Sequence, residues 1–326
     1  MAACEPERVA PADAGCLVAR DEEEHAAGLV SSVRRLAIHD GPGIRTVVFL
    51  KGCQLCCLWC AAPETQSSGR DVVFYPERCL ACDRCRAACP EEAIRVDAAG
   101  RRSLDRARCT LCGQCAEVCY AEALTMPAAW RTVGEVLAEV LRDRVFYDRS
   151  GGGVTVSGGE PLQQAEFTAA LLRACKREGL HTAMETSGFQ DWDVFERTLT
   201  DLDLLLYDLK AMDPEKHLRF TGASNERILE NLRRAVSRGV ATIIRVPVIP
   251  GFNDDEKNFQ TMGRFLAGIG PIQRVDLLPY HRFGEATYGR LGREYALATI
   301  PLMTDERLEE LAGILHGHGL RVQIGG

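Results

Sequence analysis

Short apolar runs alternate along this chain with stretches in which apolar residues recur every three or four positions. The runs are rich in aliphatic and β-branched residues and predict six buried strands, at residues 46–50, 154–157, 182–185, 204–208, 242–248 and 275–279. Strands that alternate with helices form a parallel sheet with right-handed crossovers, so we expect an α/β fold. Six units are too few to close an eight-stranded barrel, and the pattern alone does not separate an open barrel from a doubly wound sheet.

Two of the predicted helices carry clear local signals. Thr132 and Glu135 form a capping box, which predicts that a helix begins there. Phe167, Leu171 and Cys175 lie on one face of another helix. We therefore expect Cys175 to be a buried core thiol rather than a metal ligand.

Two parts of the chain fall outside this alternation. Residues 1–28 are polar, rich in alanine and acidic at 21–24, and they lack apolar periodicity, so we expect a flexible extension in which Cys4 and Cys16 have no ligand role. Residues 67–126 contain an internal repeat instead. We interpret them as an insert, with residues 29–66 and 127–326 forming the main domain.

The repeat in the insert is a cysteine pattern, C-x2-C-x2-C-x3-C, that occurs twice. This is the spacing of bacterial ferredoxins that hold two 4Fe-4S clusters, in which the fourth cysteine of each run ligates the other cluster. The expected ligand sets are Cys79, Cys82 and Cys85 with Cys119, and Cys109, Cys112 and Cys115 with Cys89. Such clusters either carry electrons or only hold a small fold together, and zinc is the alternative metal.

Three further cysteines follow the first predicted strand with C-x3-C-x2-C spacing: Cys53, Cys57 and Cys60. Three thiolates on one loop can hold three corners of a 4Fe-4S cluster and leave one iron without a protein ligand. An open position of this kind distinguishes a catalytic metal site from a structural one. Cys56 offers an alternative set with Cys53 and Cys60, whereas a zinc knuckle is disfavoured because no histidine or second cysteine pair stands nearby at zinc spacing.

Composition narrows the range of functions. The chain has 326 residues, a net charge of −7 and 46% hydrophobic residues, which indicates a globular protein and argues against non-specific nucleic-acid binding. No apolar run approaches the roughly 20 residues that span a membrane, and the N-terminus lacks a signal pattern, so we expect a cytoplasmic protein. In a reducing compartment, clustered cysteines act as metal ligands rather than as disulfides.

The cysteine loop and its surroundings resemble the activating enzymes of glycyl radical enzymes, the family of the pyruvate formate-lyase activase in the radical S-adenosylmethionine superfamily. The resemblance rests on the three-cysteine spacing and its flanks, residues 38–52 and 63–66, and it covers residues 30–326. It implies a partial (β/α)6 barrel, open on one side, with an inserted ferredoxin-like domain. Gln54, Cys56 and the pair Ala61-Ala62 depart from the usual residues of the family.

The resemblance also implies the residues that bind S-adenosylmethionine, whose amino and carboxylate groups would chelate the open iron. Matching motif positions are Trp59 against the adenine, Gly158, Gly159, Glu160 and Pro161 at the methionyl amino group, Asp208 and Lys210 in a D-L-K motif, and His281 after the sixth strand. Arg245 is expected to contact the ligand carboxylate or the incoming peptide, with a structural salt bridge as the alternative. Glu185 and Thr186, with Asp208, match the monovalent-cation site of some relatives.

The activity that this resemblance implies is that of an anaerobic oxidoreductase. One electron from the reduced cluster would cleave S-adenosylmethionine to methionine and a 5′-deoxyadenosyl radical, which takes a hydrogen atom from a backbone glycine of a partner glycyl radical enzyme. Ferredoxin or flavodoxin would supply electrons through the insert. A small-molecule or peptide-maturing radical enzyme is the first alternative, although auxiliary cysteines usually lie nearer the C-terminus there. A redox carrier with a vestigial barrel is the second, and the motif positions above argue against it.

Overall fold

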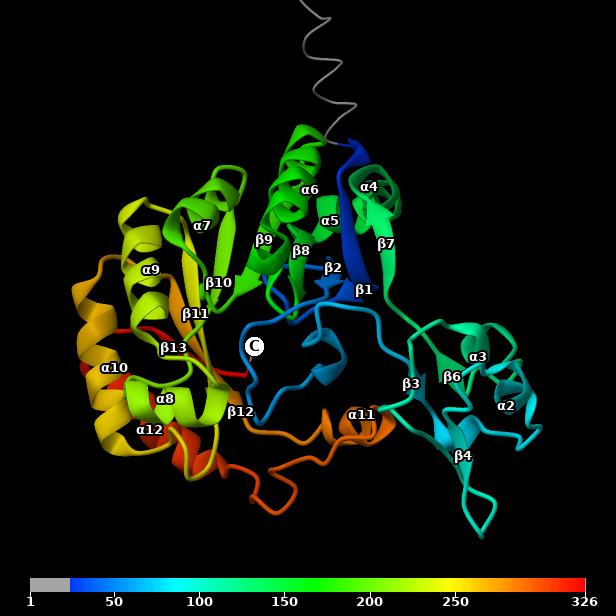
Figure 1. Cartoon of the computed structure of the whole chain (residues 1–326). Coiled ribbons are helices and arrows are strands. Elements are labelled where there is room, and N and C mark those ends of the chain that lie inside the picture. Colours follow the sequence, from blue (N-terminus) through cyan, green and yellow to red (C-terminus); the bar gives the residue numbers. More distant parts are fainter. Residues whose placement is uncertain (1–23, 326) are drawn as a thin grey trace, which may run out of the picture.

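A single nine-stranded sheet forms the centre of the main domain in the computed structural model, which describes residues 24–325 (Figure 1). Its strand order within that range is β13-β12-β11-β10-β9-β8-β2-β1-β7, and the strands from β2 to β13 all run parallel to their neighbours. β1 is antiparallel to both β2 and β7. The strands are β1 (Ala27–Ala37), β2 (Arg45–Leu50), β7 (Ala129–Thr132), β8 (Gly153–Gly158), β9 (His181–Thr186), β10 (Leu204–Asp208), β11 (Thr242–Val248), β12 (Arg274–Pro279) and β13 (Val322–Ile324).

The six strands predicted from the sequence are confirmed as β2 and β8 to β12, and the α/β class with a mostly parallel sheet is confirmed with them. β1, β7 and β13 were not predicted, because they are edge or antiparallel strands with many exposed residues and little apolar alternation. β1 begins at Ala27, inside the range expected to be an extension. Cys4, Cys16 and the other residues up to 23 lie outside the described part of the chain.

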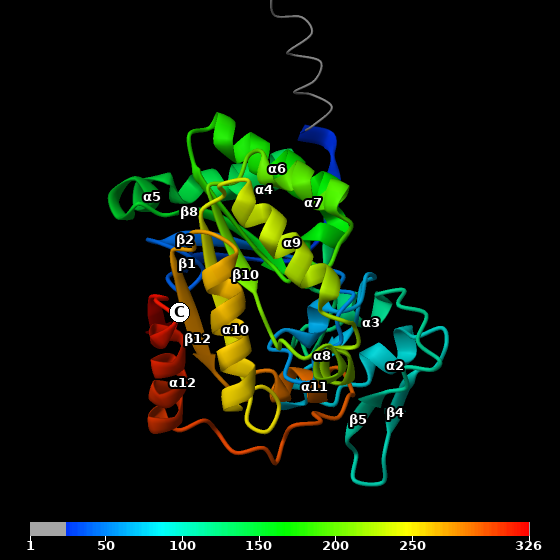
Figure 2. The same ribbon diagram turned by 90° about the vertical axis from the view of Figure 1, so that its left-hand side faces the viewer.

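Amphipathic helices cover one face of the sheet (Figure 2). Within residues 24–325 the main-domain helices are α4 (Val133–Val140), α5 (Arg144–Ser150), α6 (Ala165–Arg177), α7 (Trp192–Leu199), α8 (Pro214–Thr221), α9 (Glu226–Ser237), α10 (Glu256–Gly268), α11 (Glu285–Arg290) and α12 (Asp305–Gly317). The predicted capping box of Thr132 and Glu135 is present at the start of α4. Cys175 is fully buried in the core, as predicted, and burial raises the pKa of its thiol to about 12. No helix in the described range is long and apolar enough to cross a lipid bilayer.

Alternation along the strands separates the core from the inner face of the sheet. On β11, Ile244 and Val246 pack in the helix-covered core, while Arg245 between them lines a cavity on the other face. On β9, Met184 packs in the helix-covered core and Glu185 lines the cavity. The inner face thus places polar side chains at the cavity beside the loop that follows β2, while Ala183, Leu204, Leu206 and Ile243 form a separate apolar cluster.

The insert is a small α/β unit with its own core. β3 (Val73–Phe74) pairs with β6 (Leu124–Thr125), and β4 (Ile94–Val96) pairs with β5 (Arg102–Leu104). Each cysteine run leads into a short helix, α2 (Arg84–Ala88) or α3 (Gln114–Glu117). The core of the insert consists of Val72, Ile94, Cys115 and Leu124, with four more cysteines packed against it. A fold of this size gains little from so few apolar side chains, so bound groups would add to its stability.

Candidate active site

A cavity of about 300 Å³ lies at the carboxyl ends of β8 to β12, beside the cysteine loop. Active sites of (β/α) folds form at this end of the strands, because the loops that follow the strands converge there. The structure brings nearly all predicted site residues to this cavity: Cys53, Cys57, Trp59, Cys60, Gly158, Gly159, Glu160, Glu185, Thr186, Asp208, Lys210, Arg245 and His281. Pro161 is the exception, because it is buried at the start of η4 (Pro161–Gln164) and does not line the cavity.

Backbone hydrogen bonds fix the shape of the cysteine loop. The Cys53 N–H donates to the Gln66 carbonyl at 3.0 Å, and the Cys56 N–H donates to the Thr221 carbonyl at the end of α8 at 2.7 Å. Cys53, Cys57 and Cys60 line the cavity, whereas Cys56 is exposed and does not. This geometry favours the C-x3-C-x2-C set over the alternative set that contains Cys56.

The chemistry of these three thiols fits a cationic metal cluster. Burial raises the pKa of Cys53, of Cys57 and of Cys60, the last to about 12, and neighbouring thiols raise the pKa of Cys53 and Cys60 further. Without a positive partner, these cysteines would remain protonated at neutral pH. A metal cluster lowers thiol pKa values by binding the thiolates, so the site has the properties expected of a 4Fe-4S ligand set.

Gly158 and Gly159 bring β8 against the two ends of the cysteine loop. Gly158 has φ of +123°, and a Cβ added there would lie 2.2 Å from the Leu50 nitrogen. A Cβ at Gly159 would lie 2.3 Å from the Gly52 carbonyl oxygen. Only glycine permits this close approach, so the two residues set the distance between β8 and the cysteine loop.

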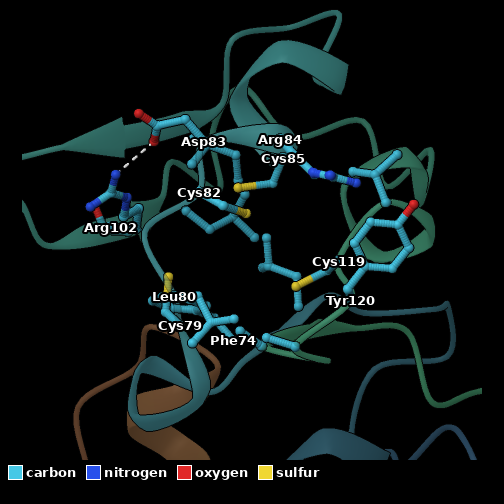
Figure 3. Close-up of a pocket in the computed structure, with 17 residues that line it drawn as sticks. Phe74, Cys79, Leu80, Cys82, Asp83, Arg84, Cys85, Arg102, Cys119 and Tyr120 are labelled. Carbon is cyan, nitrogen blue, oxygen red and sulfur yellow. Dashed lines mark hydrogen bonds and ion pairs between the residues drawn. The ribbon is translucent and has the colours of Figure 1, made fainter.

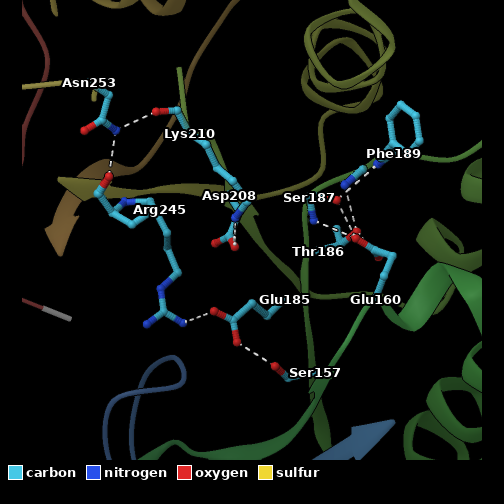
Figure 4. Close-up of polar contacts among 12 residues, drawn as sticks. Ser157, Glu160, Glu185, Thr186, Ser187, Phe189, Asp208, Lys210, Arg245 and Asn253 are labelled. Atoms are coloured by element: carbon cyan, nitrogen blue, oxygen red, sulfur yellow. Dashed lines mark hydrogen bonds and ion pairs between the residues drawn. The ribbon is translucent and has the colours of Figure 1, made fainter. Parts of the chain in front are cut away.

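Glu160 is fully engaged by protein donors. Its Oε1 accepts hydrogen bonds from the Thr186 hydroxyl at 2.5 Å and the Leu162 N–H at 3.2 Å, and its Oε2 accepts from the Ser187 hydroxyl at 2.6 Å and the Ser187 N–H at 2.9 Å (Figure 4). Burial raises the pKa of Glu160, while these four donors favour the carboxylate. The side chain therefore joins η4 to the end of β9. Ser187 was not predicted, because no motif singles it out.

Arg245 and Glu185 form an ion pair on the inner face of the sheet. Arg245 Nη1 lies 2.6 Å from Glu185 Oε1, and the Ser157 hydroxyl donates to Glu185 Oε2 at 2.6 Å (Figure 4). Arg245 Nε is buried and has no hydrogen-bond partner within the described chain. Arg245 thus has both the structural salt bridge and a donor left for a ligand. The cation site expected on Glu185, Thr186 and Asp208 stays a prediction.

Asp208 and Lys210 form a second ion pair, with Lys210 Nζ 2.9 Å from Asp208 Oδ2. Burial lowers the pKa of Lys210, but Asp208 and Cys57 outweigh burial and raise it on balance, so the amine is charged. Asn253 holds this segment in place, because its Nδ2 donates to the carbonyls of Lys210 and Pro247. Asn253 was not predicted as a site residue.

Trp59 and His281 both line the cavity. Trp59 packs against Phe252, with ring centroids 4.7 Å apart, and is nearly buried. The His281 ring stacks on the exposed ring of Phe283 at 4.2 Å, and burial lowers its pKa, so the ring is neutral at pH 7. Tyr288 of α11 was not predicted, yet its hydroxyl lies 3.5 Å from the Cys57 carbonyl oxygen.

In the insert, the four cysteines of the first predicted set lie around one cavity, and the two ligand sets stay a prediction. Cys79, Cys82, Cys85 and Cys119 line one largely apolar cavity of about 240 Å³ (Figure 3). Burial raises the pKa of Cys115 to about 11, with further contributions from the nearby Cys109, Cys89 and Cys112. Tyr120 stands where the two-cluster ferredoxin pattern usually has proline. Its ring is exposed, and the Arg84 guanidinium lies over it, 4.4 Å from the ring centroid.

A mostly parallel α/β sheet whose strand ends converge on a three-cysteine loop defines a radical S-adenosylmethionine enzyme. In agreement, residues 106–262 match the Radical SAM superfamily, and residues 71–120 match the 4Fe-4S dicluster domain. The solved radical SAM methyltransferase from Sphaerobacter thermophilus shares the fold, with a TM-score of 0.51 at 18% identity over 86% of this chain and 66% of that chain.

Curated relatives specify the family within this class. The isethionate sulfite-lyase activating enzyme of Nitratidesulfovibrio vulgaris is 43% identical over 86% of this chain and 94% of its own length. The trans-4-hydroxy-L-proline dehydratase activating enzyme of Clostridioides difficile is 40% identical over 91% and 99%, and the benzylsuccinate synthase activating enzyme of Thauera aromatica is 42% identical over 91% and 92%. The chain therefore belongs to the activating enzymes of glycyl radical enzymes.

Proposed function

We propose that Cys53, Cys57 and Cys60 hold a 4Fe-4S cluster and that S-adenosylmethionine binds beside it in the cavity of about 300 Å³. The observation that carries this proposal is the convergence of three half-buried thiols and two partly buried ion pairs on one cavity. When bound, the cluster and S-adenosylmethionine supply the radical chemistry, which ends in hydrogen abstraction from a glycine of the partner enzyme.

The side chains around the cavity have the charges that S-adenosylmethionine requires. The Lys210 ammonium and the free Nε of Arg245 are suited to a carboxylate, and Asp208 is suited to ribose hydroxyls. Neutral His281 can donate or accept a hydrogen bond at the cavity wall. Because the Glu160 side chain is engaged elsewhere, we assign the methionyl amino group to backbone carbonyls of residues 158–160.

We also propose two 4Fe-4S clusters in the insert, which makes three in the whole chain, and a ferredoxin or flavodoxin as electron donor. The crossed cysteine sets support this count. Within the described residues the cysteines are free thiols, which is compatible with a reducing compartment, and we place the activity in the cytoplasm.

The partner is a glycyl radical enzyme. Overall sequence similarity does not distinguish which class of reaction that partner catalyses. Three relatives with 40–43% identity are named for a sulfite-lyase, a dehydratase and a synthase. We propose that the glycine loop of the partner enters the same cavity, because the hydrogen donor must reach the cleaved ligand directly. A glycyl radical signal in the partner, measured by electron paramagnetic resonance after incubation with this chain, would identify it.

A pair of neighbouring cysteines tests the ligand assignment. Cys57→Ala should abolish 5′-deoxyadenosine formation from S-adenosylmethionine in the anaerobically reconstituted chain, because the cluster loses one of three ligands. Cys56→Ala is the matched control and should keep the activity, since Cys56 is exposed and outside the cavity. Full activity of Cys57→Ala, together with loss of activity in Cys56→Ala, would show that Cys56 rather than Cys57 is the cluster ligand.

A further inference from the structure

A groove of about 520 Å³ runs between the insert and the region of α11. Four arginines line it: Arg101, Arg102 and Arg106 from the insert, and Arg290 from α11. Asp97 is the one acidic side chain among the described residues that line the groove. The chain as a whole carries a net charge of −7, so this groove is a local basic site on an acidic protein.

Arg102 pairs with Asp83 at 2.8 Å and Arg290 with Glu77 at 2.7 Å, so the donors left for a partner lie on Arg101 and Arg106. Arg101 pairs with Asp97 at 2.7 Å, but 81% of its side chain remains exposed. Arg106 donates only to backbone, to the Val72 carbonyl at 2.8 Å and to the Arg290 carbonyl at 3.3 Å, and it forms no ion pair within the described residues. Its Nε is buried without a hydrogen-bond partner in the described chain. The positive charge of Arg106 is therefore not cancelled within the groove.

The groove adjoins the first cysteine cavity of the insert. Phe74, Cys79, Arg102, Ser103 and Leu104 line both spaces. Figure 3 shows Cys79 and Arg102 on the same side of that cavity. The active-site cavity, in contrast, shares no lining residue with the groove. A protein bound in the groove would thus lie beside the first cysteine set and leave the active site open to the glycine loop.

We propose that this groove is the docking site of the electron donor, and that the donor is a small one-electron carrier with an acidic surface. The inference rests on the proposed clusters of the insert. One electron leaves the reduced carrier and enters the group bound by Cys79, Cys82, Cys85 and Cys119, so the carrier is oxidised by one electron and no bond is made or broken. Opposite charges accelerate such an encounter and make it sensitive to salt.

Charge changes in the groove test the proposal by direct binding. Ser103 is exposed and lines the groove without an ion pair, so Ser103→Glu adds a negative charge and removes no contact partner. The affinity of an acidic flavodoxin for the reconstituted holoenzyme, measured by anaerobic calorimetry at low salt, should fall about tenfold, with a flatter salt dependence. Ser103→Gln controls for size and should bind like the parent. Arg101→Glu is the second groove variant, and Arg233→Glu, on the exposed side of α9, is its matched control.

The outcomes separate this inference from the proposed function. Unchanged flavodoxin affinity in both Ser103→Glu and Arg101→Glu would overturn the groove assignment, and so would competition between flavodoxin and a glycine-loop peptide. Cleavage of S-adenosylmethionine by the parent chain with a chemical reductant bypasses the groove. Failure of that reaction would reject the proposed active site. If the reaction succeeds but the variants bind flavodoxin as the parent does, only the docking site is rejected.

Discussion

Arg45 is the largest side chain that is fully buried in the described chain, and its hydrogen bonds join β2, β8 and β9. It donates to the Thr155 hydroxyl at 2.7 Å and to the Val154 carbonyl at 2.6 Å. Burial lowers the pKa of Arg45 to about 10, so it is still charged at neutral pH. His181 Nδ1 lies 3.3 Å from Arg45 Nη2 and must accept the proton of that donor, which requires a neutral ring.

This contact predicts a dependence of stability on pH. Burial and the charge of Arg45 lower the pKa of His181, so below about pH 6.5 the unfolded chain binds a proton that the folded chain does not. The free energy of unfolding should therefore decrease as the pH falls from 7.5 to 5.5. His181→Gln keeps an acceptor for Arg45 and should show a shallower decrease in urea titrations at these pH values. His316→Gln, on the exposed side of α12, should follow the parent, and a slope unchanged in His181→Gln would exclude this role.

The sequence predicted the reactive residues better than the residues that support them. Cysteine spacing within one loop is fixed by the covalent chain, so Cys53, Cys57 and Cys60 could be identified without a fold. Ser187, Asn253 and Tyr288 are common residue types, and only the packing of distant segments gives them partners at Glu160, Lys210 and Cys57. No local pattern encodes such pairings.

At the scale of elements, the close approach of β8 to β2 depends on Gly158. Gly158→Ala would place a Cβ 2.2 Å from the Leu50 nitrogen, so β8 and β2 must separate. We expect a loss of at least about 3 kcal/mol in the free energy of unfolding and loss of S-adenosylmethionine binding, measured by urea titration and equilibrium dialysis. Gly179→Ala is the control, because Gly179 also has positive φ, +74°, but a Cβ there meets nothing within 4 Å. It should lose only about 1–2 kcal/mol, and equal losses in both variants would refute the steric argument.

α11 connects the insert to the cysteine loop. On one side the Tyr288 hydroxyl reaches the Cys57 carbonyl, and on the other Arg290 pairs with Glu77 at 2.7 Å while its carbonyl accepts from Arg106. Figure 1 shows α11 between the loop after β2 and the insert. This contact fixes the orientation of the insert relative to the active site.

Removal of Arg106 should loosen that contact. Arg106→Ala loses the donors to the Val72 and Arg290 carbonyls, and we expect faster hydrogen–deuterium exchange at residues 71–79 and 285–293, with a loss of about 1–3 kcal/mol. Arg108→Ala is the control, because Arg108 is exposed and its nearest acidic oxygen lies 3.7 Å away. Exchange that stays at the parent rate in Arg106→Ala would show that the insert is held by other contacts.

Element prediction succeeded where one face of a segment is buried and failed at the edges of the sheet. β8 to β12 are almost entirely buried, and their apolar runs are unmistakable. β1 pairs with β2 and β7 but carries an exposed end at Arg34–Leu36, which hides the strand pattern. Similarly, whether the sheet forms an open barrel depends on how the strands are arranged in space, and the hydropathy pattern does not determine that arrangement.

For the whole molecule, the insert and the main domain each gather their own cysteines, and the active-site cavity and the groove share no residues. A protein bound in the proposed groove would therefore leave the active-site cavity free. Along the chain, the insert lies between β2 and β7. The segment after the cysteine loop leads into the insert. Lys51, which is buried just before the loop, forms an ion pair of 2.7 Å with Asp71 near the start of the insert.

Iron content measures how many sites the whole chain holds. Three 4Fe-4S clusters require about 12 irons per chain after anaerobic reconstitution. Cys82→Ala removes one expected ligand from the first insert set and should lower the content to about 8, while S-adenosylmethionine binding persists, because the active-site cavity contains none of these residues. Turnover driven by a protein reductant should become slower in the same variant. Cys175→Ala, which alters a core thiol, is the control and should retain about 12 irons. A parent content near four would mean that the insert holds no iron, and unchanged turnover in Cys82→Ala would limit its clusters to a structural role.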